Sequence, residues 1–451
     1  MFGLDVERTP GFKFLLAIVV AMALTAPLFS IWLLVYDRKA QSREATASIT
    51  QGWGAAQVIS GPMLVIPYRT WVTQSLVQNG QNVTRSNQVT RELVLAPEAA
   101  QLTTEINPKV RKRSIYEAVV YDARNKGQAR FAFPADLARS GVTPSQMELG
   151  RAELRFEFSD PRGVGANAQI TANGQLLRLE PGAGSSGARG FFALVDARGL
   201  GAKPLNVDFA FDLRGNRSLS LAARAGDTRW TVRSSWTSPS FAGDFLPGDR
   251  HVGDGGFKAN YRIGNLALGR SLVSTRDSGG QASQPQPDLA QTAQISLIQP
   301  VDPYSQVNRA TKYGFLFIGF TFLALLLFDL IGGARVSAVE YLLMGAALVL
   351  FFVLLLAFAE VMGFTAAYIL ASGAIAGLNT AYCAAILESW RRAGFIGALL
   401  AGLYALLYVL LSLEAYSLLI GALLLFVALA GLMYLTRRID WGSRREAFTA
   451  G

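Results

Sequence analysis

Long apolar runs lie near both ends of this chain, with a more polar segment between them. The first, FLLAIVVAMALTAPLFSIWLLV, covers Phe14–Val35, and a nearly continuous second run extends from Tyr313 to Leu435. A bilayer core about 30 Å thick requires roughly 20 apolar residues in each helix that crosses it. The first run is too long for a signal peptide and no small-residue cleavage site follows it, so it predicts an uncleaved transmembrane anchor.

Charges and small residues divide the second run into five segments, each long enough to cross the bilayer as a helix. These segments are Tyr313–Ile331, about Val336–Phe358, Met362–Leu387, Gly394–Leu413 and Ala415–Leu435. The sequence therefore predicts six membrane spans, one before and five after a segment of about 277 residues.

The segment between the spans has the period-two alternation of half-buried β-strands. In RAELRFEFSD, 151–160, the apolar side chains share one face and the charged ones share the other. LNVDFAFDLRG, 205–215, and GFKANYRIG, 256–264, repeat this alternation. Helical periodicity of comparable length is missing from the sequence of this segment, which predicts a mainly antiparallel β-domain, either a sandwich or a large open sheet.

Turn-forming residues separate these strands and predict hairpins at four places. The four stretches are DARNKGQ (122–128), TANGQ (171–175), LRGNRS (213–218) and ARAGDT (223–228). Two further stretches, 180–190 and 277–291, are rich in Gly, Ser, Gln and Pro, which predicts flexible loops.

The positions of Lys and Arg predict the orientation of the spans, because cationic residues stay on the cytoplasmic side of a membrane. With the N-terminus inside, Arg335 and Arg391 fall in short cytoplasmic connections. Arg38 and Lys39, next to the first span, favour the opposite orientation, but long domains cross the membrane largely regardless of such charges. We therefore expect the large segment to lie outside the cytoplasm, in the periplasm of a Gram-negative cell.

These assignments predict a membrane protein with an extracytoplasmic β-domain inserted between one N-terminal transmembrane helix and a C-terminal bundle of five. The expected parts are a cytoplasmic N-terminus over 1–13, an anchor helix over 14–35, a periplasmic β-rich domain over 36–312, a transmembrane bundle over 313–435 and a cytoplasmic tail over 436–451. The β-domain carries the whole net charge of +10, with 33 Lys and Arg against 23 Asp and Glu. That excess favours contact with lipid headgroups or other polyanions, although scattered arginines are also typical of an ordinary solvated surface.

The residue types available for chemistry exclude several kinds of site. The chain has one cysteine, Cys383 in the fourth span, and one histidine, His251 in the β-domain. One copy therefore cannot form a Cys–His nucleophile pair or a histidine-rich metal site. The motifs GxSxG, GxxxxGK[ST] and HExxH are absent from the sequence. We expect no catalytic residue, no metal and no cofactor.

One stretch brings the histidine together with several charged side chains. SFAGDFLPGDRHVGDGGFKANYRIGN, 240–265, contains turn signals at LPGD and GDGG and ends in a predicted strand. Its candidate binding residues are Asp244, Asp249, Arg250, His251 and Asp254, and Lys258 follows them in the strand. The aspartates recur every five residues, which matches neither a calcium loop nor a helical face. We interpret the stretch as a polar loop whose aspartates cap turns, with a ligand-binding loop near the membrane as the alternative.

Polar residues inside the spans give a second set of candidates, because such residues often have a function. The acidic ones lie near the span ends, where water and headgroups can solvate them. The fourth span contains Ser372, Asn379 and Thr380, together with Gly373 and Gly377 in GxxxG spacing. This pattern favours helix packing, with a substrate path as the second interpretation.

Three long blocks carry a family resemblance. They begin at WTSPSFAGDF (236–269), VDPYSQVNRA (301–330) and VEYLLMGAAL (339–372), and GPMLVIPY (61–68) and RKRSIYEAVVYDA (111–123) are weaker matches. These blocks resemble the CreD family of bacterial inner-membrane proteins. The resemblance implies an anchor, a large periplasmic domain and a multi-helix C-terminal region, in a protein associated with envelope integrity and stress tolerance. It implies no catalytic residue.

We therefore predict a non-enzymatic inner-membrane protein that supports envelope integrity by binding an envelope component or a protein partner through its periplasmic β-domain. The expected partners are membrane lipids and that component, with no nucleic acid. One alternative is a membrane transporter or lipid-handling protein that uses the C-terminal helix bundle. Another is an envelope hydrolase that uses Asp249 or Asp254.

Overall fold

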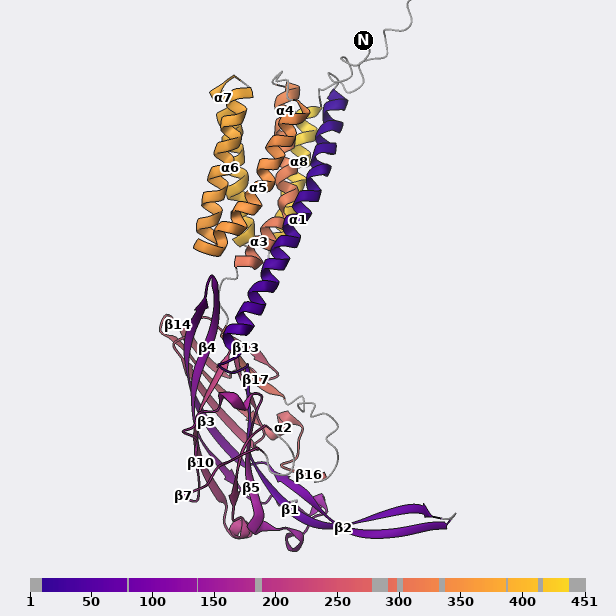
Figure 1. Cartoon of the computed structure of the whole chain (residues 1–451), viewed down its shortest axis with the longest axis vertical. Coiled ribbons are helices and arrows are strands. Elements are labelled where there is room, and N and C mark those ends of the chain that lie inside the picture. Colours follow the sequence, from indigo (N-terminus) through magenta and orange to yellow (C-terminus); the bar gives the residue numbers. More distant parts are fainter. Residues whose placement is uncertain are drawn as a thin grey trace, which may run out of the picture. The chain divides into compact units, whose positions relative to one another are not determined.

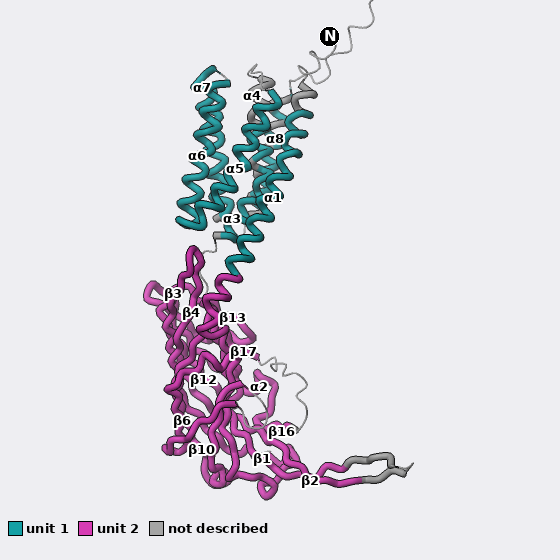
Figure 2. Tube along the Cα trace, in the orientation of Figure 1, with its two compact units in different colours: residues 1–43, 301–451 teal, residues 44–300 magenta. Residues whose placement is uncertain are grey.

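The computed structural model describes residues 10–78, 81–135, 137–182, 189–277, 291–297, 303–331, 337–386, 388–412 and 417–437. The chain divides into two compact units, one formed by 44–300 and the other by 1–43 together with 301–451 (Figure 2). The first unit is built mainly of strands and the second of helices (Figure 1). The stretches 183–188 and 278–290, within the predicted flexible loops, lie outside the described residues.

The strands of the β-unit form two sheets. Sheet A has the order β13 (Pro239–Gly243), β17 (Thr292–Leu297), β11 (Ser218–Ala222), β1 (Gln57–Gln78), β5 (Ala152–Phe158), β9 (Gly190–Val195) and β8 (Glu180–Pro181), with β2 (Gln81–Leu95) paired to β1 and β16 (Val273–Asp277) paired to β2. Sheet B has the order β14 (Asp249–Gly253), β15 (Gly256–Gly264), β12 (Asp227–Ser234), β3 (Ala99–Arg113), β4 (Tyr116–Phe131), β10 (Leu205–Asn216), β6 (Gln169–Ala172) and β7 (Gln175–Leu176).

Most strand pairs in these sheets are antiparallel, and β1 with β11 and β12 with β3 are parallel. Short helices occur in the connections: η2 (Leu137–Ser140), η3 (Pro144–Gln146), η4 (Leu149–Arg151), η5 (Pro161–Gly163), η7 (Arg198–Gly201) and α2 (Asn265–Leu268). Buried side chains of both sheets belong to one apolar core. The β-unit is therefore a sandwich, and the predicted mainly antiparallel β-domain is confirmed.

The alternation in the sequence correctly predicted which side chains enter this core. Ala152, Leu154, Phe156 and Phe158 of β5 are buried, and the odd-numbered positions 205–213 of β10 and 257–263 of β15 are buried in the same way. The Phe156 ring packs against the rings of Phe191 and Phe209, each with a centroid separation of 5.2 Å. Buried aromatic rings contribute large apolar areas, so this cluster is a main source of stability.

Only part of the turn prediction is correct. Asn173 and Gly174 have φ values of 50° and 83° and join β6 to β7, as expected for a tight hairpin. The stretch 122–128 is not a turn, because it lies inside β4 and pairs with β3 and β10. Gly127 occurs there because the Phe209 ring occupies the space that a Cβ would fill. The stretches 213–218 and 223–228 connect one sheet to the other and do not form hairpins.

A polar network crosses the core beneath sheet B. Trp230 Nε1 donates to Thr104 Oγ1 at 2.9 Å, and that hydroxyl donates to Asn125 Oδ1 at 2.9 Å. The Asn125 amide in turn donates to the carbonyl oxygens of Ala123 and Phe211. All three side chains of the network are fully buried. Their hydrogen bonds offset the cost of removing polar groups from water.

A buried ion pair lies on the face of sheet A that points away from the apolar core. The guanidinium of Arg155 on β5 donates to both carboxylate oxygens of Glu92 on β2, with distances of 2.7 and 3.0 Å. Its Nε also donates to Glu153 at 2.8 Å. The side chains of Arg155 and Glu92 are only 3% and 6% exposed. The strand β1 lies between β2 and β5, so the ion pair links β2 to β5 across β1.

A second carboxylate fixes the start of β1. Asp160 accepts from the backbone N–H of Ala55 at 3.0 Å and from the side chain of Arg162. The Arg162 hydrogen bond outweighs the effect of partial burial and lowers the pKa of Asp160 to about 2, with further help from the N–H groups of Ala55 and Arg162. Asp160 is therefore a point at which acid should weaken the fold.

The second unit consists of helices. They are α1 (Pro10–Thr50), α3 (Pro303–Lys312), α4 (Gly314–Ile331), α5 (Ala338–Met362), α6 (Phe364–Ile386), α7 (Trp390–Ser412) and α8 (Ser417–Thr436). Along the described residues, four helices are long and apolar enough to cross a membrane, namely α1, α5, α6 and α7. The apolar stretches described in α4 and α8 are shorter, so the number of five C-terminal spans stays a prediction.

The helix α1 is longer than its apolar run. Its 41 residues correspond to about 60 Å, twice the thickness of a bilayer core. Gly345 of α5 leaves room for Leu24 of α1, which lets these two helices approach closely. Tyr304, near the start of α3, donates to Glu360, near the end of α5, at 3.1 Å, and Arg38 of α1 lies 3.9 Å from the same carboxylate. Residues 1–9 and 438–451, most of the predicted cytoplasmic termini, lie outside the described residues.

Candidate functional site

The candidate residues of the stretch 240–265 are distributed over two sheets. Asp249, Arg250 and His251 lie on β14 and Asp254 lies in the turn before β15, all in sheet B. Asp244 follows β13 in sheet A, where its carboxylate accepts from the N–H of Thr292 at 2.9 Å. The expected loop is therefore wrong for Asp249–Gly253, because the backbone of these residues pairs with β15.

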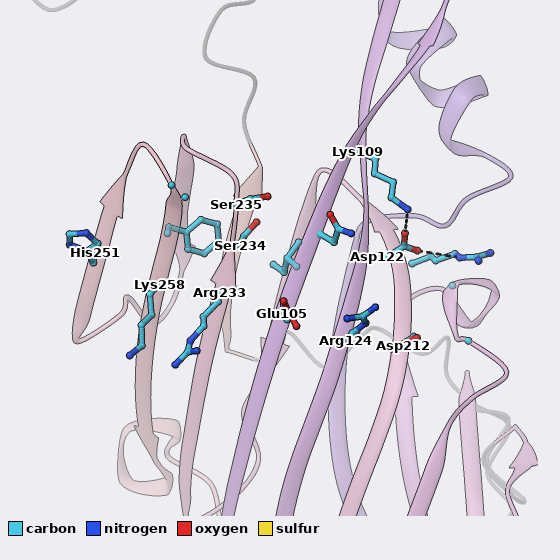
Figure 3. A pocket seen from close by; sticks show the side chains of 18 of the residues that line it. Glu105, Lys109, Asp122, Arg124, Asp212, Arg233, Ser234, Ser235, His251 and Lys258 are labelled. Atoms are coloured by element: carbon cyan, nitrogen blue, oxygen red, sulfur yellow. Dashed lines mark hydrogen bonds and ion pairs between the residues drawn. The ribbon is translucent and has the colours of Figure 1, made fainter.

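The strand register of sheet B places six polar side chains side by side on its outer face (Figure 3). In order across β14, β15, β12, β3, β4 and β10, they are His251, Lys258, Arg233, Glu105, Arg124 and Asp212. Their neighbours along each central strand, such as Phe257 and Val232, are buried in the core. Alternation along a strand therefore turns the charged residues outward. The six line a groove of about 930 Å³.

On the side of the groove formed by β3, β4 and β10, three cations, Lys109, Arg111 and Arg214, have acidic or aromatic partners. The Asp122 carboxylate lies 2.8 Å from Lys109 Nζ and 3.4 Å from Arg214 Nε. The guanidinium groups of Arg111 and Arg214 lie 4.7 and 4.9 Å from the ring centroid of Trp53. The positive charges on this side are therefore largely neutralised, and cation–π contacts attach its strands to Trp53 at the start of the β-unit.

On the side formed by β14, β15 and β12, the cations are not compensated. Lys258 and Arg233 are exposed and lie directly opposite each other on β15 and β12. Within the described part of the chain, neither side chain forms a hydrogen bond or an ion pair. Like charges directly opposite on neighbouring strands repel each other. The groove thus keeps a local positive charge, beside the imidazole of His251 (Figure 3).

The same outer face continues beyond this row with mostly uncharged polar groups. A second hollow of about 490 Å³ is bordered by the amides and hydroxyls of Gln101, Thr103, Gln128, Gln169 and Thr171, together with one cation, Lys126, and one acid, Asp208. The amides and hydroxyls form hydrogen bonds without adding charge, and the two charged residues add no net charge. The face as a whole can therefore contact a ligand that carries one charged group and a larger polar part.

The polar candidates in the helical unit do not form one site. On α6, the hydroxyls of Ser372 and Thr380 donate to carbonyls of their own helix, at Ile369 and Ala376. Asn379 is 2% exposed and its Nδ2 has no hydrogen-bond partner within the described part of the chain. Thr380 packs against Gly397 of α7.

The predicted packing role of the GxxxG glycines is wrong for the described chain. Among the described residues, no atom that could contact a Cβ at Gly373 or Gly377 lies within 4 Å. The close approach of α6 to α7 instead uses Gly397. A GxxxG spacing therefore did not identify the helix interface here.

Comparison with known proteins identifies the family. The sequence model of the family described as inner membrane protein CreD matches residues 9–442. The chain belongs to the CreD family. The inner membrane protein CreD of Escherichia coli (strain K12) is 31% identical over 424 residues, which are 93% of this chain and 91% of that protein. The resemblance seen in the sequence blocks is confirmed, and this CreD-family chain is an inner membrane protein.

Solved structures add no functional information about this CreD-family chain. An M1 zinc metallopeptidase from Deinococcus radiodurans aligns with a TM-score of 0.21 and 10% identity, over 45% of this chain and 42% of its own. That similarity is too low to indicate a shared fold.

Sequence analysis did not predict which side chains lie in the same row as His251 in the groove. Arg233 and Glu105 come from strands that are distant in sequence from β14, and β12 pairs with β3 in parallel. The alternation in TVRSS does indicate that Arg233 is on a polar face. The sequence contains no comparable signal for the register that brings Arg233 beside Lys258.

Proposed function

We propose that this CreD-family protein supports the integrity of the cell envelope, without catalysis, by binding an envelope component in the groove of its β-unit. We expect this unit to face the periplasm and both chain ends to face the cytoplasm, on the ground of the positive charges in the short connections. The observation that supports binding is the pair formed by Lys258 and Arg233. Their positive charges repel each other until a ligand supplies the opposite charge.

Complementation tests this function in the full-length protein. A strain that lacks the gene is grown under detergent and β-lactam stress and supplied with wild type, with Arg233→Glu/Lys258→Glu, or with a control. The control, Arg229→Glu/Arg262→Glu, changes the same charge on the same two strands and the same face. We expect the first double variant to fail and the control to rescue at equal protein level. Rescue by both variants would refute a role for the groove.

A second function, transport or lipid handling by the helix bundle, is favoured by one observation. Asn379 buries an amide whose Nδ2 lacks a partner among the described residues. Polar groups inside a membrane protein are costly and often contact a substrate. If the bundle carries the function, Asn379→Leu should abolish complementation while the groove variants rescue. The opposite result would leave the groove as the working part.

A further inference from the structure

The paired strands β12 and β15 carry two cross-strand pairs of cations on the same face, and only one of them is neutralised. Arg229 and Arg262 are directly opposite, and Asp227 bridges them, with distances of 3.2 and 3.0 Å to the two Nε atoms. The hydrogen bond from Arg262, with a smaller contribution from Arg229, holds the pKa of Asp227 below its usual value. At this level of the sheet, the fold itself supplies the anion.

At the second pair of cations, four residues further along β12, no acidic side chain among the described residues bridges the two cations. Arg233 and Lys258 are directly opposite, and the next residue in the row is Glu105 on β3. Among the described residues, Glu105 forms no ion pair with either of them. The two levels share strands, face and charge, so the missing counter-ion is a local property of the groove.

We propose that Arg233 and Lys258 bind the phosphate group of an anionic envelope component, an inference that rests on the function proposed above. Adjacent strands are about 4.8 Å apart, so two long cationic side chains on neighbouring strands can converge on one small anion. A guanidinium offers a planar fork of donors and an ammonium adds a compact charge. A phosphate monoester has three free oxygens and up to two negative charges, which matches both cations, and a phosphodiester has one charge spread over two free oxygens that the two cations can share. A carboxylate has a single negative charge, and one arginine can already bind both of its oxygens, so it would not need the second cation.

The rest of the row restricts the kind of ligand. Glu105 and Asp212 alternate with the cations across β3, β4 and β10, and Asp254 lines the groove near His251. These carboxylates repel a chain of uniformly spaced negative charges. A ligand with one localised phosphate and an otherwise uncharged or cationic body fits better, because the amides and hydroxyls further along the face can contact that body. Phospholipid headgroups and soluble phosphorylated sugars share this chemistry.

Calorimetric titration of the full-length protein in an uncharged detergent tests the proposal. The probes are glycerol 3-phosphate, which is soluble, and short-chain phosphatidylglycerol, with glycerol as the uncharged reference. We expect at least one phosphate probe to bind and glycerol not to bind. Binding of the lipid alone identifies the membrane as the source of the phosphate, and binding of glycerol 3-phosphate shows that the phosphate group suffices.

Two double variants give the contrast. Arg233→Gln/Lys258→Gln should weaken binding by roughly tenfold or more, since both charged contacts are lost. Arg229→Gln/Arg262→Gln, the matched control, should bind within about twofold of wild type, because these arginines are already paired with Asp227. All four side chains lie on the exposed face, so both variants are expected to fold. If both phosphate probes fail to bind, or if the two variants lose binding equally, the proposal is overturned.

Complementation separates failure of this proposal from failure of the proposed function. If neither phosphate probe binds but Arg233→Glu/Lys258→Glu still fails to rescue, the groove has a function and its ligand is not a phosphate. If that variant rescues and no probe binds, both the ligand and the role of the groove are refuted.

Discussion

Removal of Arg155 should strongly destabilise the β-unit. Its guanidinium makes a two-pronged contact with Glu92 and a third bond to Glu153, and its side chain is 3% exposed. In Arg155→Met, the buried Glu92 carboxylate loses both of its hydrogen bonds to this guanidinium. Breaking a buried ion pair from one side costs about 3–5 kcal/mol. Since 1 kcal/mol shifts Tm by roughly 2–4 °C in a domain of this size, we expect Tm to fall by roughly 6–20 °C.

Thermal unfolding of the full-length protein in detergent, followed by tryptophan fluorescence, measures this change. Two further variants isolate its cause. Glu92→Met/Arg155→Met removes both charges and should recover most of the loss, because an apolar pair of similar volume needs no counter-ion. Arg198→Met removes an exposed ion pair with Asp196 and should cost less than about 1 kcal/mol. A Tm for Arg155→Met within 2 °C of wild type, or a double variant as unstable as the single one, would refute the reasoning.

Four other outcomes are expected. The folded-state pKa of Asp160, about 2, lies below its ordinary value, so the ionised carboxylate stabilises the fold above about pH 4. This contribution is lost as the pH falls toward 2, and Asp160→Asn should therefore flatten that part of an acid-unfolding curve. Thr104→Val leaves a buried indole N–H without its acceptor and should cost about 1–3 kcal/mol in chemical unfolding. His251→Ala should keep full complementation, because the positive charge of the groove comes from other side chains; a null phenotype at normal protein level would contradict this. A cytoplasmic reporter fused after Gly451 should be active, whereas a reporter that works only when exported would reverse the topology.

The features that the sequence predicted well depend on short-range patterns. The apolar positions of β5, β10 and β15 alternate within a few residues, and each one points into the core as expected. The anchor and the apolar C-terminal helices are visible in the same way, because hydropathy is a local property. The apolar helices, and the buried faces of these three strands, could therefore be predicted without knowledge of the fold.

The features that were missed depend on long-range pairing. Residues 122–128 have the composition of a turn, yet β3 and β10 on either side hold them in a strand. Arg233 meets Lys258 and Glu105 only because β12 has β15 on one side and β3 on the other. Register is set by contacts across the sheet, so the pattern of one sequence could not predict which side chains line the groove together.

The short strand β14 also affects the solubility of the protein. It is the last strand in the order of sheet B, so its outer edge has backbone groups that no strand of the described residues covers in that sheet. Such edges can recruit strands of other molecules, and proteins protect them with short length and charged side chains. β14 has five residues and begins with Asp249 and Arg250, followed by His251. Asp249, Arg250 and His251, first considered as candidate ligand residues, thus help to protect this edge of sheet B against pairing with strands of other molecules.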